Sequence, residues 1–431
     1  MKILCIYQFF STGRTPDTIR PFRLCRLLAE RGHDVTVLAT DFNRHSGETE
    51  GPQVEIIPTT GKPLHVLRLP SVRNYRKGLI QRFLNYAGFS VRVFWKGFNI
   101  ADVDLVLTSI PPTFVGPVGW LIARLRQKPF FLEIRDLWPD ALEVKGAVKN
   151  RVLLRLLYAL SHFLYRKAAF IVTVTYGIKQ ELIGKGIDPT AIEVLPNGFD
   201  CELFQGAAER DKTRQKNGWG NDFVAIYIGT LVEVTSMDTV VEAAEKLKNV
   251  SNIRFEIFGA GNTEPVLRTM IRDKGISNCR LNGTVAKQEV PALLNAADVC
   301  LMCLFETPLA HIYFQNKFFD YLGAGKPIVG AMKGHQRLIL ENIGAGMCVD
   351  PKDSTGLAKA VQYLAEHRNM AKKMGQEGKA YAMKYFGLDD ILERYANILI
   401  GYASGISQSA SPGSMPPLSP QKSSCAVEVP S

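Results

Sequence analysis

The chain has 431 residues, of which 46% are hydrophobic and 22% charged, which is typical of globular proteins and favours two domains over one. The formal net charge of +11 suggests polyanionic partners such as membrane surfaces, nucleic acid or phosphorylated substrates. Among its eight cysteines, Cys300 and Cys303 form the C-x-x-C pair. It lies in a predicted buried strand without a second ligand pair, so we do not expect a zinc site, and the scattered cysteines suit a reducing compartment.

The first half of the chain alternates strand and helix patterns. An amphipathic helix that ends at Gly32 lies between the first two predicted strands. An uncharged run, 105–123, holds three prolines, so we predict strand, loop and helix there and no membrane span. The N-terminus is too short and too polar for a signal peptide. The predicted strands cover residues 2–7, 34–40, 103–109, 129–134 and 169–175.

A polar stretch, 205–222, predicts a connection between domains or a small helix on it. The strand and helix rhythm then restarts, and we predict two doubly wound, Rossmann-like α/β domains that face each other across a cleft. The predicted strands of this half cover residues 223–229, 253–259, 279–283, 298–303 and 326–330. We place the parts at 1–204 (acceptor side), 205–385 (nucleotide-sugar side), 386–403 (terminal helix) and 404–431 (a Ser/Pro-rich, disordered tail).

Two glycine-rich turns raise the question of a nucleotide. "GAGK", ending at Lys326, is not a Walker loop, because Asp320 stands at the position of the first glycine and the helix precedes the strand. Gly259 and Gly261 follow a strand and precede a helix. As a dinucleotide fingerprint this second turn is weak, but it predicts a tight turn that a nucleotide can approach.

At this point the chain resembles a known family. The segments of the second half resemble the donor half of retaining glycosyltransferases of the GT-B fold, in "FGAG", "NGTVAKQEVPALLNAADVCL", "NKFFDYLGAGKPIVG" and "GAGMCVDPKDSTGLAKAV". The first half resembles the family 4-like subgroup, similar to bacterial polysaccharide and fucosamine transferases, in "RPFRLCRLLAERGHDVTVLAT", "SIPPTFVGPVGWLIARLRQKPFFLEIRDLWPDAL" and "VLPNGFD". The likeness covers about residues 1–400, and "RDLWPD" and "NKFFDYLGAGKPIV" are its most specific parts.

The resemblance explains the acid inside the apolar helix. Asp320 takes the place of the second acid in the family's pattern, which implies that it accepts hydrogen bonds from ribose hydroxyls. The first acid of the pattern would fall at Ile312 and is absent, so Glu306 or His311 is expected to contact the donor sugar instead. Alternatives remain open: Asp320 on a solvated helix face, and His311 as an ordinary loop histidine.

The diphosphate of the donor needs positive charge. The resemblance implies that Lys317, beside Asn316 at the start of the same helix, stabilises the leaving diphosphate together with free backbone N–H groups. A surface lysine is the alternative. Gly229 and Thr230 are expected to contact the donor. Many relatives carry basic residues in this loop, whereas Thr230 and Thr235 offer hydroxyls without charge.

Four residues of the first half are further candidates. Gly13 is expected to let phosphate approach the backbone, with Arg14 adding charge. Arg20 is expected either to add charge as well or to sit on the helix surface. Asp136 in "RDLWPD" follows a strand, so it should point into the cleft and serve catalysis, and a structural capping role is the alternative.

Two runs without acids, 56–101 and 144–180, contain eight and seven Lys or Arg residues. Solvated basic faces, and burial of the apolar helix faces in the runs, are the plainer interpretations. The alternative is an anionic membrane surface, met by basic residues and exposed aromatics. We expect a cytoplasmic protein, peripheral on the inner face of the membrane.

The resemblance to glycosyltransferases implies an enzyme. We expect a retaining glycosyltransferase that moves a hexosyl or N-acetylhexosaminyl group from a nucleotide-sugar co-substrate, without metal or other cofactor. The expected acceptor is an oligosaccharide or lipid-linked glycan of surface polysaccharide or lipopolysaccharide synthesis. Alternatives are a nucleotide-sugar epimerase of the same fold and a non-catalytic partner subunit. Nucleic acid is not an expected partner, because no recognised module occurs.

Overall fold

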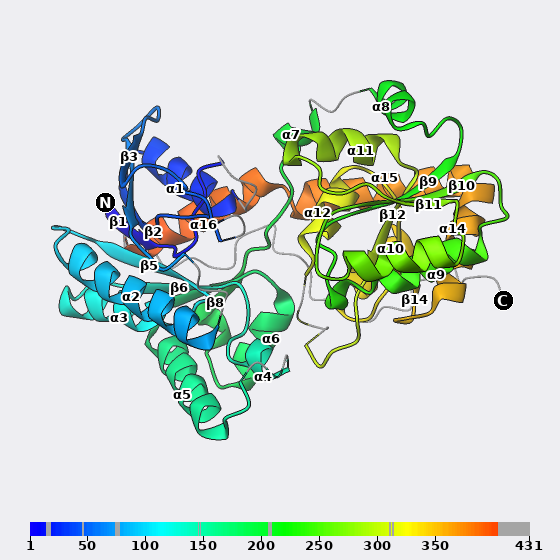
Figure 1. The fold of residues 1–431 in the computed structure, drawn as a ribbon. Helices are drawn as coiled ribbons and strands as arrows, with labels where there is room; N and C mark the ends of the chain where they lie inside the picture. The colour runs from blue at the N-terminus through cyan, green and yellow to red at the C-terminus, as the bar shows by residue number, and fades with distance from the viewer. Residues whose placement is uncertain are drawn as a thin grey trace. The chain divides into compact units, whose positions relative to one another are not determined.

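The computed structural model describes residues 1–13, 19–44, 47–73, 78–144, 146, 148–205, 209–309, 312 and 314–403. Arg14, His311 and the predicted tail lie outside these residues. The chain forms two compact units, and each is a parallel sheet with helices on its faces (Figure 1), which confirms the predicted α/β fold class. Unit 1 contains Met1–Pro196 and resumes at Asp389, and unit 2 is Asn197–Leu388. The sequence-based division after residue 204 is therefore later than the structural one, and the terminal helix joins unit 1.

Unit 1 is built on a sheet with the order β3-β4-β2-β1-β5-β6-β7-β8. Its strands are β1 (Lys2–Ile6), β2 (Asp34–Thr40), β3 (Val54–Ile57), β4 (Leu64–Leu69), β5 (Leu105–Ile110), β6 (Phe130–Ile134), β7 (Phe170–Thr173) and β8 (Ile192–Val194). All neighbours are parallel except β3 and β4, which pair antiparallel. The central strands are buried on both sides, because helices cover both faces.

The helices of unit 1 are α1 (Arg20–Glu30), α2 (Leu79–Phe98), α3 (Val115–Leu125), α4 (Asp140–Val144), α5 (Arg151–Lys167), α6 (Tyr176–Gly184) and, mostly after the return of the chain, α16 (Leu388–Ala403). In Figure 1, α1 and α16 cover one face of the sheet, and α2 and α3 cover the other. Side-chain caps fix where two of them begin. The side-chain oxygen of Asn150 accepts the backbone N–H groups of Val152 and Leu153 at α5, and Thr175 caps α6.

A buried ion pair joins distant parts of unit 1. Arg20, at the start of α1, donates to Glu133 on β6 over 2.5 Å and to the carbonyl oxygen of Leu195 over 3.1 Å. Its guanidinium carbon lies 5.5 Å from the ring centre of Tyr395 on α16. Arg20 is 3% exposed and the Glu133 side chain 1%. This corrects both expectations for Arg20: it neither sits on the helix surface nor offers a free charge to a phosphate.

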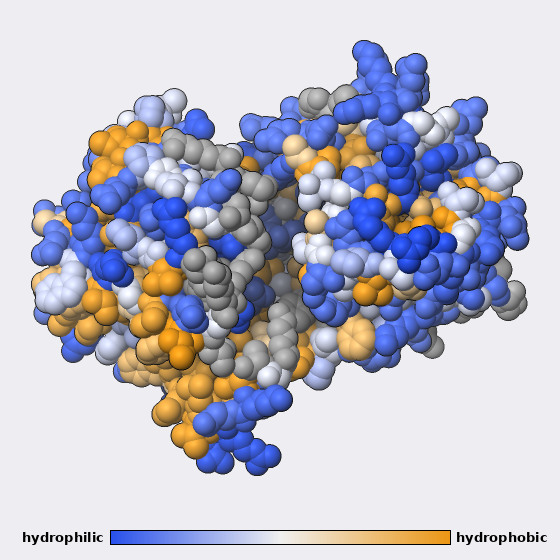
Figure 2. Space-filling view, viewed as in Figure 1, coloured by the Kyte–Doolittle hydropathy of each residue, from blue (hydrophilic) through white to orange (hydrophobic). Residues whose placement is uncertain are grey.

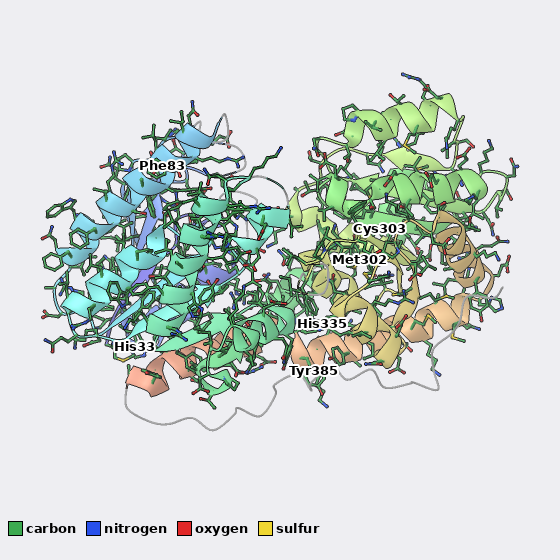
Figure 3. All side chains as sticks on the ribbon, turned by 90° about the horizontal axis from the view of Figure 1, so that it is seen from below. His33, Phe83, Met302, Cys303, His335 and Tyr385 are labelled. Carbon is green, nitrogen blue, oxygen red and sulfur yellow. The ribbon has the colours of Figure 1, made fainter. Side chains whose placement is uncertain are left out.

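Unit 2 has a six-stranded sheet, all parallel, with the order β11-β10-β9-β12-β13-β14. Its strands are β9 (Phe223–Ile228), β10 (Ile253–Phe258), β11 (Cys279–Leu281), β12 (Val299–Cys303), β13 (Ile328–Ala331) and β14 (Gly346–Val349). Cys300 and Cys303 are buried on β12, as predicted, and Cys303 is labelled within this unit in Figure 3.

The helices of unit 2 are α7 (Cys201–Gln205), α8 (Arg210–Asn217), α9 (Met237–Lys246), α10 (Glu264–Asp273), α11 (Val290–Ala296), α12 (Asn316–Gly323), α13 (His335–Ile343), α14 (Ser354–Glu366) and α15 (Arg368–Tyr385). The polar stretch that was predicted as a connection between domains or a small helix on it contains the helix α8, which is part of this unit. Arg210 and Arg214 of α8 reach the Asp298 carboxylate over 2.6 and 3.2 Å. Charge pairing with the start of β12 therefore anchors a helix that has little apolar surface.

Removing one partner of the buried pair should destabilise unit 1. We expect Glu133→Ala to lower the free energy of unfolding by about 3–5 kcal/mol, because the Arg20 guanidinium is left buried without its counter-charge. Chemical denaturation measures the loss, and hydrogen exchange assigns it to unit 1. The matched control is Arg26→Ala on the same helix, whose exposed pair with Glu30 should contribute less than about 1 kcal/mol. Equal losses for the two variants would show that the buried pair stabilises unit 1 no more than an exposed pair does.

Candidate functional site

The sheet of unit 2 reverses its direction of growth between β9 and β12. Strands β10 and β11 lie on one side of this point, and β13 and β14 on the other. In open parallel sheets the loops diverge at such a point and leave a crevice beside the carboxyl ends of the strands. The loop after β9 begins at Gly229, and α12 follows the loop after β12. The candidate site of unit 2 is this edge of the sheet.

Glycines allow the loops after β9 and β10 to pack backbone against backbone. A Cβ atom on Gly259 would lie 1.8 Å from the carbonyl oxygen of Gly229, and one on Gly261 would lie 1.9 Å from that of Leu231. Gly259 also has a φ of +145°. The Leu231 N–H donates to the Ala260 carbonyl oxygen over 3.0 Å. These two glycines are therefore required by loop packing, whatever a ligand adds.

Lys317 places an amino group at the carboxyl end of β9. Its Nζ lies 2.6 Å from the hydroxyl of Tyr227 and 4.1 Å from the centre of that ring. A Cβ on Gly229 would be 2.7 Å from the same nitrogen. Burial lowers the pKa of the Lys317 ammonium to about 7. The sequence predicted a cation beside the start of α12, and the structure adds Tyr227, which no pattern in the sequence indicated, as its partner.

Asp320 lies one turn further along α12 and is half-buried. Burial raises the pKa of its carboxyl to about 7, Lys287 acts in the opposite direction, and Asp200 raises it further. The carboxylate has no hydrogen-bond partner among the described residues. Half of such groups carry a charge at neutral pH, so a ligand that donates hydroxyl groups can shift the balance towards the ionised form.

Hydrogen bonds hold α12 in place at this edge. The Tyr321 hydroxyl accepts the Ile228 N–H over 2.9 Å, at the end of β9. At the exposed start of the helix, the side-chain amide of Asn197 donates to Asn316 over 2.7 Å. Lys317 and Asp320 are therefore presented from a helix whose position is set by β9.

The other predicted site residues of unit 2 differ in exposure and in their partners. Thr230 is exposed in the loop after β9. Thr235 is buried, and its hydroxyl donates to the Val232 carbonyl oxygen over 2.7 Å, so the idea that it offers a hydroxyl to phosphate is wrong. Glu306 is exposed and pairs with Lys333 over 2.9 Å.

In unit 1, Gly13 and Asp136 lie in the loops that follow β1 and β6. Gly13 has a φ of +91°, with open space where a Cβ atom would stand. Asp136 is exposed. Both loops are at the carboxyl edge of the sheet, on strands separated by β5, so they belong to one side of unit 1.

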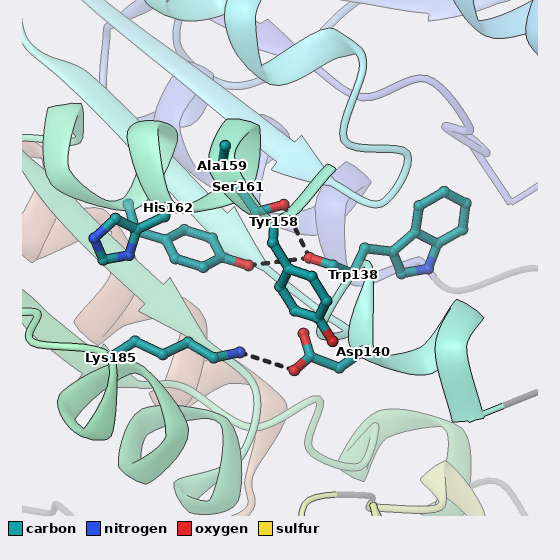
Figure 4. A pocket seen from close by; sticks show the side chains of 8 residues that line it. Trp138, Asp140, Tyr158, Ala159, Ser161, His162 and Lys185 are labelled. Atoms are coloured by element: carbon teal, nitrogen blue, oxygen red, sulfur yellow. Dashed lines mark hydrogen bonds and ion pairs between the residues drawn. The ribbon is translucent and has the colours of Figure 1, made fainter. Parts of the chain in front are cut away.

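A pocket in unit 1 was not predicted. It has a volume of about 310 Å³ and lies between the "LWPD" loop, α5 and the residue after α6 (Figure 4). Its lining is Trp138, Asp140, Tyr158, Ala159, Ser161, His162, Tyr165 and Lys185. The available signal was the second acid of "RDLWPD", Asp140, which the sequence analysis quoted without assigning it a role.

Comparison with known proteins matches both units. A model of the glycosyl transferase 4-like domain covers residues 20–198, and one of glycosyl transferases group 1 covers 222–367. The putative colanic acid biosynthesis glycosyl transferase WcaI of Escherichia coli is 23% identical over 359 residues, 79% of this chain and 83% of that protein. A GDP-mannose-dependent alpha-(1-6)-phosphatidylinositol monomannoside mannosyltransferase of Mycolicibacterium smegmatis is 25% identical over 366 residues, 76% of this chain and 96% of that protein.

Solved structures agree on the fold. Anabaena HepE in complex with UDP matches with a TM-score of 0.68 at 17% identity, covering 93% of this chain and all of that chain. Two parallel α/β units of this kind define the GT-B class of glycosyltransferases. The chain belongs to this family, with a family 4-like first half and a group 1 second half. The resemblance to glycosyltransferases of the GT-B fold is therefore confirmed.

Proposed function

We propose that the chain transfers a sugar, with retention of configuration, from a nucleoside-diphosphate sugar to a lipid-linked glycan in surface polysaccharide synthesis. One observation carries the donor side of this proposal: Lys317 and Asp320 project from one helix beside the glycine loops at the carboxyl end of β9. The names of the relatives support it, because WcaI is described in colanic acid biosynthesis and HepE was crystallised with UDP.

Different residues would bind the ribose, the diphosphate and the sugar of the donor. The ionised Asp320 carboxylate accepts hydrogen bonds from the ribose hydroxyls. Lys317 and the free N–H groups at the start of α12, next to Asn316, meet the diphosphate. Gly229, Thr230, Gly259 and Gly261 supply backbone close to the nucleotide, and Glu306 and His311 are assigned to the sugar.

The chemical step needs stabilisation of the departing diphosphate. Protonated Lys317 neutralises charge as the bond to the sugar breaks, and the leaving phosphate helps to take the proton of the acceptor hydroxyl. The contribution of the protein is mainly positioning and electrostatic stabilisation. Asp136, with Gly13 and Arg14 in the same unit, is assigned to the acceptor and its orientation.

The membrane part of the proposal starts from an uncovered apolar surface. The sequence analysis favoured burial of the α2 face, but only some of its apolar residues, such as Phe89 and Val93, are buried. Figure 2 shows hydrophobic residues gathered over α2 and α5, and Phe83 stands on the outer side of α2 in Figure 3. The exposed residues are Ile80, Phe83, Leu84, Val91, Trp95, Phe98, Val152, Leu153 and Leu156.

Basic residues accompany this surface. Arg82, Arg92 and Lys96 are exposed on α2, and Arg151 and Arg155 on α5. Cations beside exposed aromatics suit the interface of an anionic bilayer, where each nearby cation contributes roughly 1 kcal/mol. Within the described ranges, no helix combines the length and apolarity needed to cross a membrane. We place the protein on the cytoplasmic face, held peripherally.

Donor affinity should be highest near neutral pH. Lys317 must be protonated to hold a diphosphate and has a pKa of about 7, so affinity should fall as the pH rises above 7. Asp320 must be ionised to accept ribose hydroxyls and also has a pKa of about 7, so affinity should fall as the pH drops below 7. Each limb reaches up to about tenfold per pH unit. Calorimetry with UDP and with GDP from pH 6 to 9 measures both limbs.

Variants separate the two groups. Lys317→Met should flatten the alkaline limb, and Asp320→Asn the acidic limb. Asp320→Ala should weaken nucleotide binding by about 1–3 kcal/mol at pH 7. The control Lys216→Met changes an exposed lysine of the same unit, whose partner Glu289 is also exposed, and should leave the profile unchanged. A wild-type profile without limbs would refute the assigned roles.

Asp136 should matter for transfer more than for donor affinity. It lies on unit 1, whereas the proposed nucleotide contacts lie on unit 2. We expect Asp136→Asn to lower turnover by roughly 10²-fold, with UDP or GDP affinity nearly intact. Turnover that survives would make Asp136 structural, and a joint loss of affinity and melting temperature would mean that it holds its loop. A parent protein with no turnover on any nucleotide sugar and lipid acceptor would favour a non-catalytic subunit.

Membrane association should depend on both charge and the α2 face. We expect flotation with anionic vesicles at low salt and release at about 1 M salt, where the Debye length is about 3 Å. Trp95→Ser, which removes a side chain of a residue that is 63% exposed, should weaken binding. The control Val266→Ser changes an apolar residue of unit 2 that is 61% exposed and should not. Flotation that resists salt, or equal behaviour of the two variants, would contradict the proposal.

A further inference from the structure

The pocket of unit 1 contains polar groups whose hydrogen-bonding capacity is only partly satisfied within the protein. Lys185 Nζ lies 2.9 Å from Asp140 Oδ1. Oδ2 of the same carboxylate is buried and accepts no hydrogen bond of good geometry, and the Tyr158 hydroxyl lies next to this carboxylate. A carboxylate can accept several hydrogen bonds, and a buried acceptor that lacks one carries a free-energy cost. A ligand that donates a hydroxyl to Asp140 Oδ2 would remove this cost.

An aromatic ring forms the wall next to this carboxylate. The Tyr158 hydroxyl donates to Glu143 over 2.6 Å, and Lys185 Nζ lies 5.8 Å from the centre of the Tyr158 ring. Figure 4 shows the Tyr158 ring with its hydroxyl end beside Asp140. Burial and the hydrogen bond to Glu143 raise the pKa of Tyr158, so the ring stays uncharged. A ring face beside a carboxylate and an ammonium matches a sugar, which has apolar C–H faces and a rim of hydroxyls.

The rear of the pocket is held rigidly. The Trp138 carbonyl oxygen accepts hydrogen bonds from the Ser161 hydroxyl over 3.0 Å and from the Tyr165 hydroxyl over 3.4 Å. Both donors are on α5, as is Tyr158. The loop and the helix therefore keep their spacing, and the volume of about 310 Å³ is at the lower end of the range for small-molecule sites.

The charged residues around the pocket determine which part of a substrate can bind in it. Among the described residues around the pocket, Asp140 and Glu143 bring two carboxylates against the ammonium of Lys185, which disfavours a phosphate or diphosphate here. Arg155 and Arg151 continue the Tyr158 side of α5 at helical spacing, outwards from the pocket. Next to them are the exposed Val152 and Leu156 of the apolar surface. Towards its start, α5 therefore exposes basic and apolar residues side by side, within about two turns of Tyr158.

We propose that this pocket binds a neutral sugar ring of the acceptor, an amphiphile whose anionic group meets the α5 arginines and whose lipid lies on the apolar residues. The inference rests on the proposed function, because it names the acceptor class for that transfer. It assigns Asp140, Lys185 and Tyr158 to sugar binding. Asp136, four residues before Asp140 in the same loop segment, keeps its separate role.

Saturation-transfer NMR on the full chain tests the pocket directly. The probes are methyl glycosides of glucose, galactose, mannose, fucose and N-acetylglucosamine. We expect at least one of them to bind, with affinity reduced about tenfold by Tyr158→Leu and by Asp140→Asn. Tyr158→Phe keeps the ring and should retain most of the binding. Asp34→Asn, which removes a carboxylate paired with Lys2 elsewhere in unit 1, should behave like the wild type.

UDP and GDP binding on the same samples separates the possible failures. Pocket variants that keep nucleotide affinity and melting temperature are folded, so their loss of glycoside signal supports the proposal. Absence of any glycoside signal up to about 100 mM, or a signal that survives both Tyr158→Leu and Asp140→Asn, overturns it. Glycoside binding without nucleotide binding or turnover would support the sugar pocket and contradict the proposed transfer.

Discussion

The fold of unit 1 depends on a buried charge pair that joins several of its elements. Arg20 and Glu133 come from a helix and a strand far apart in the sequence, and neither could be buried alone, because an isolated charge in an apolar interior is very costly. The same guanidinium reaches the Leu195 carbonyl oxygen and faces the Tyr395 ring. The Arg20 side chain thus links α1, β6, the backbone at Leu195 and α16. The loops that hold Gly13 and Asp136 adjoin these elements.

The sequence predicted those elements whose burial produces a recognisable pattern of apolar residues. Strands such as β5 and β12 are covered on both faces, so they read as continuous apolar runs. The β3–β4 hairpin was missed. On β3 the apolar Val54 and Ile56 are exposed while the acid between them, Glu55, is buried, so the usual apolar-inside pattern is reversed there. Arg20 was misjudged for another reason. Its partner is over a hundred positions away, and the acid within "FFLEI" was the only sign that a buried cation was needed.

Prediction of the site depended on the family resemblance, and the structure adds physical reasons. The resemblance singled out Lys317 and Asp320, while their burial and the pKa shifts follow from where α12 meets β9. Thr235 was misjudged, because a short helical turn directs its hydroxyl inwards. The sugar pocket could not be predicted from any one motif, because its walls are brought together by the packing of α5 against a loop. A sequence motif contains residues that are adjacent in the chain, whereas the residues that line this pocket come from separate segments that are adjacent only in the folded structure.

The return of the chain to unit 1 has a consequence for biosynthesis. Within the described residues unit 2 is continuous in sequence, whereas unit 1 needs α16 to cover its sheet, and the ribosome makes this helix after residues 197–387. Domains generally fold in the order of synthesis, and here the later one can finish first. Until residues 389–403 emerge, the buried places of Tyr395 and Leu399 are open. The nascent first half is therefore a natural client for a chaperone, and a chain cut short at residue 388 would keep an intact unit 2 beside an unfinished unit 1.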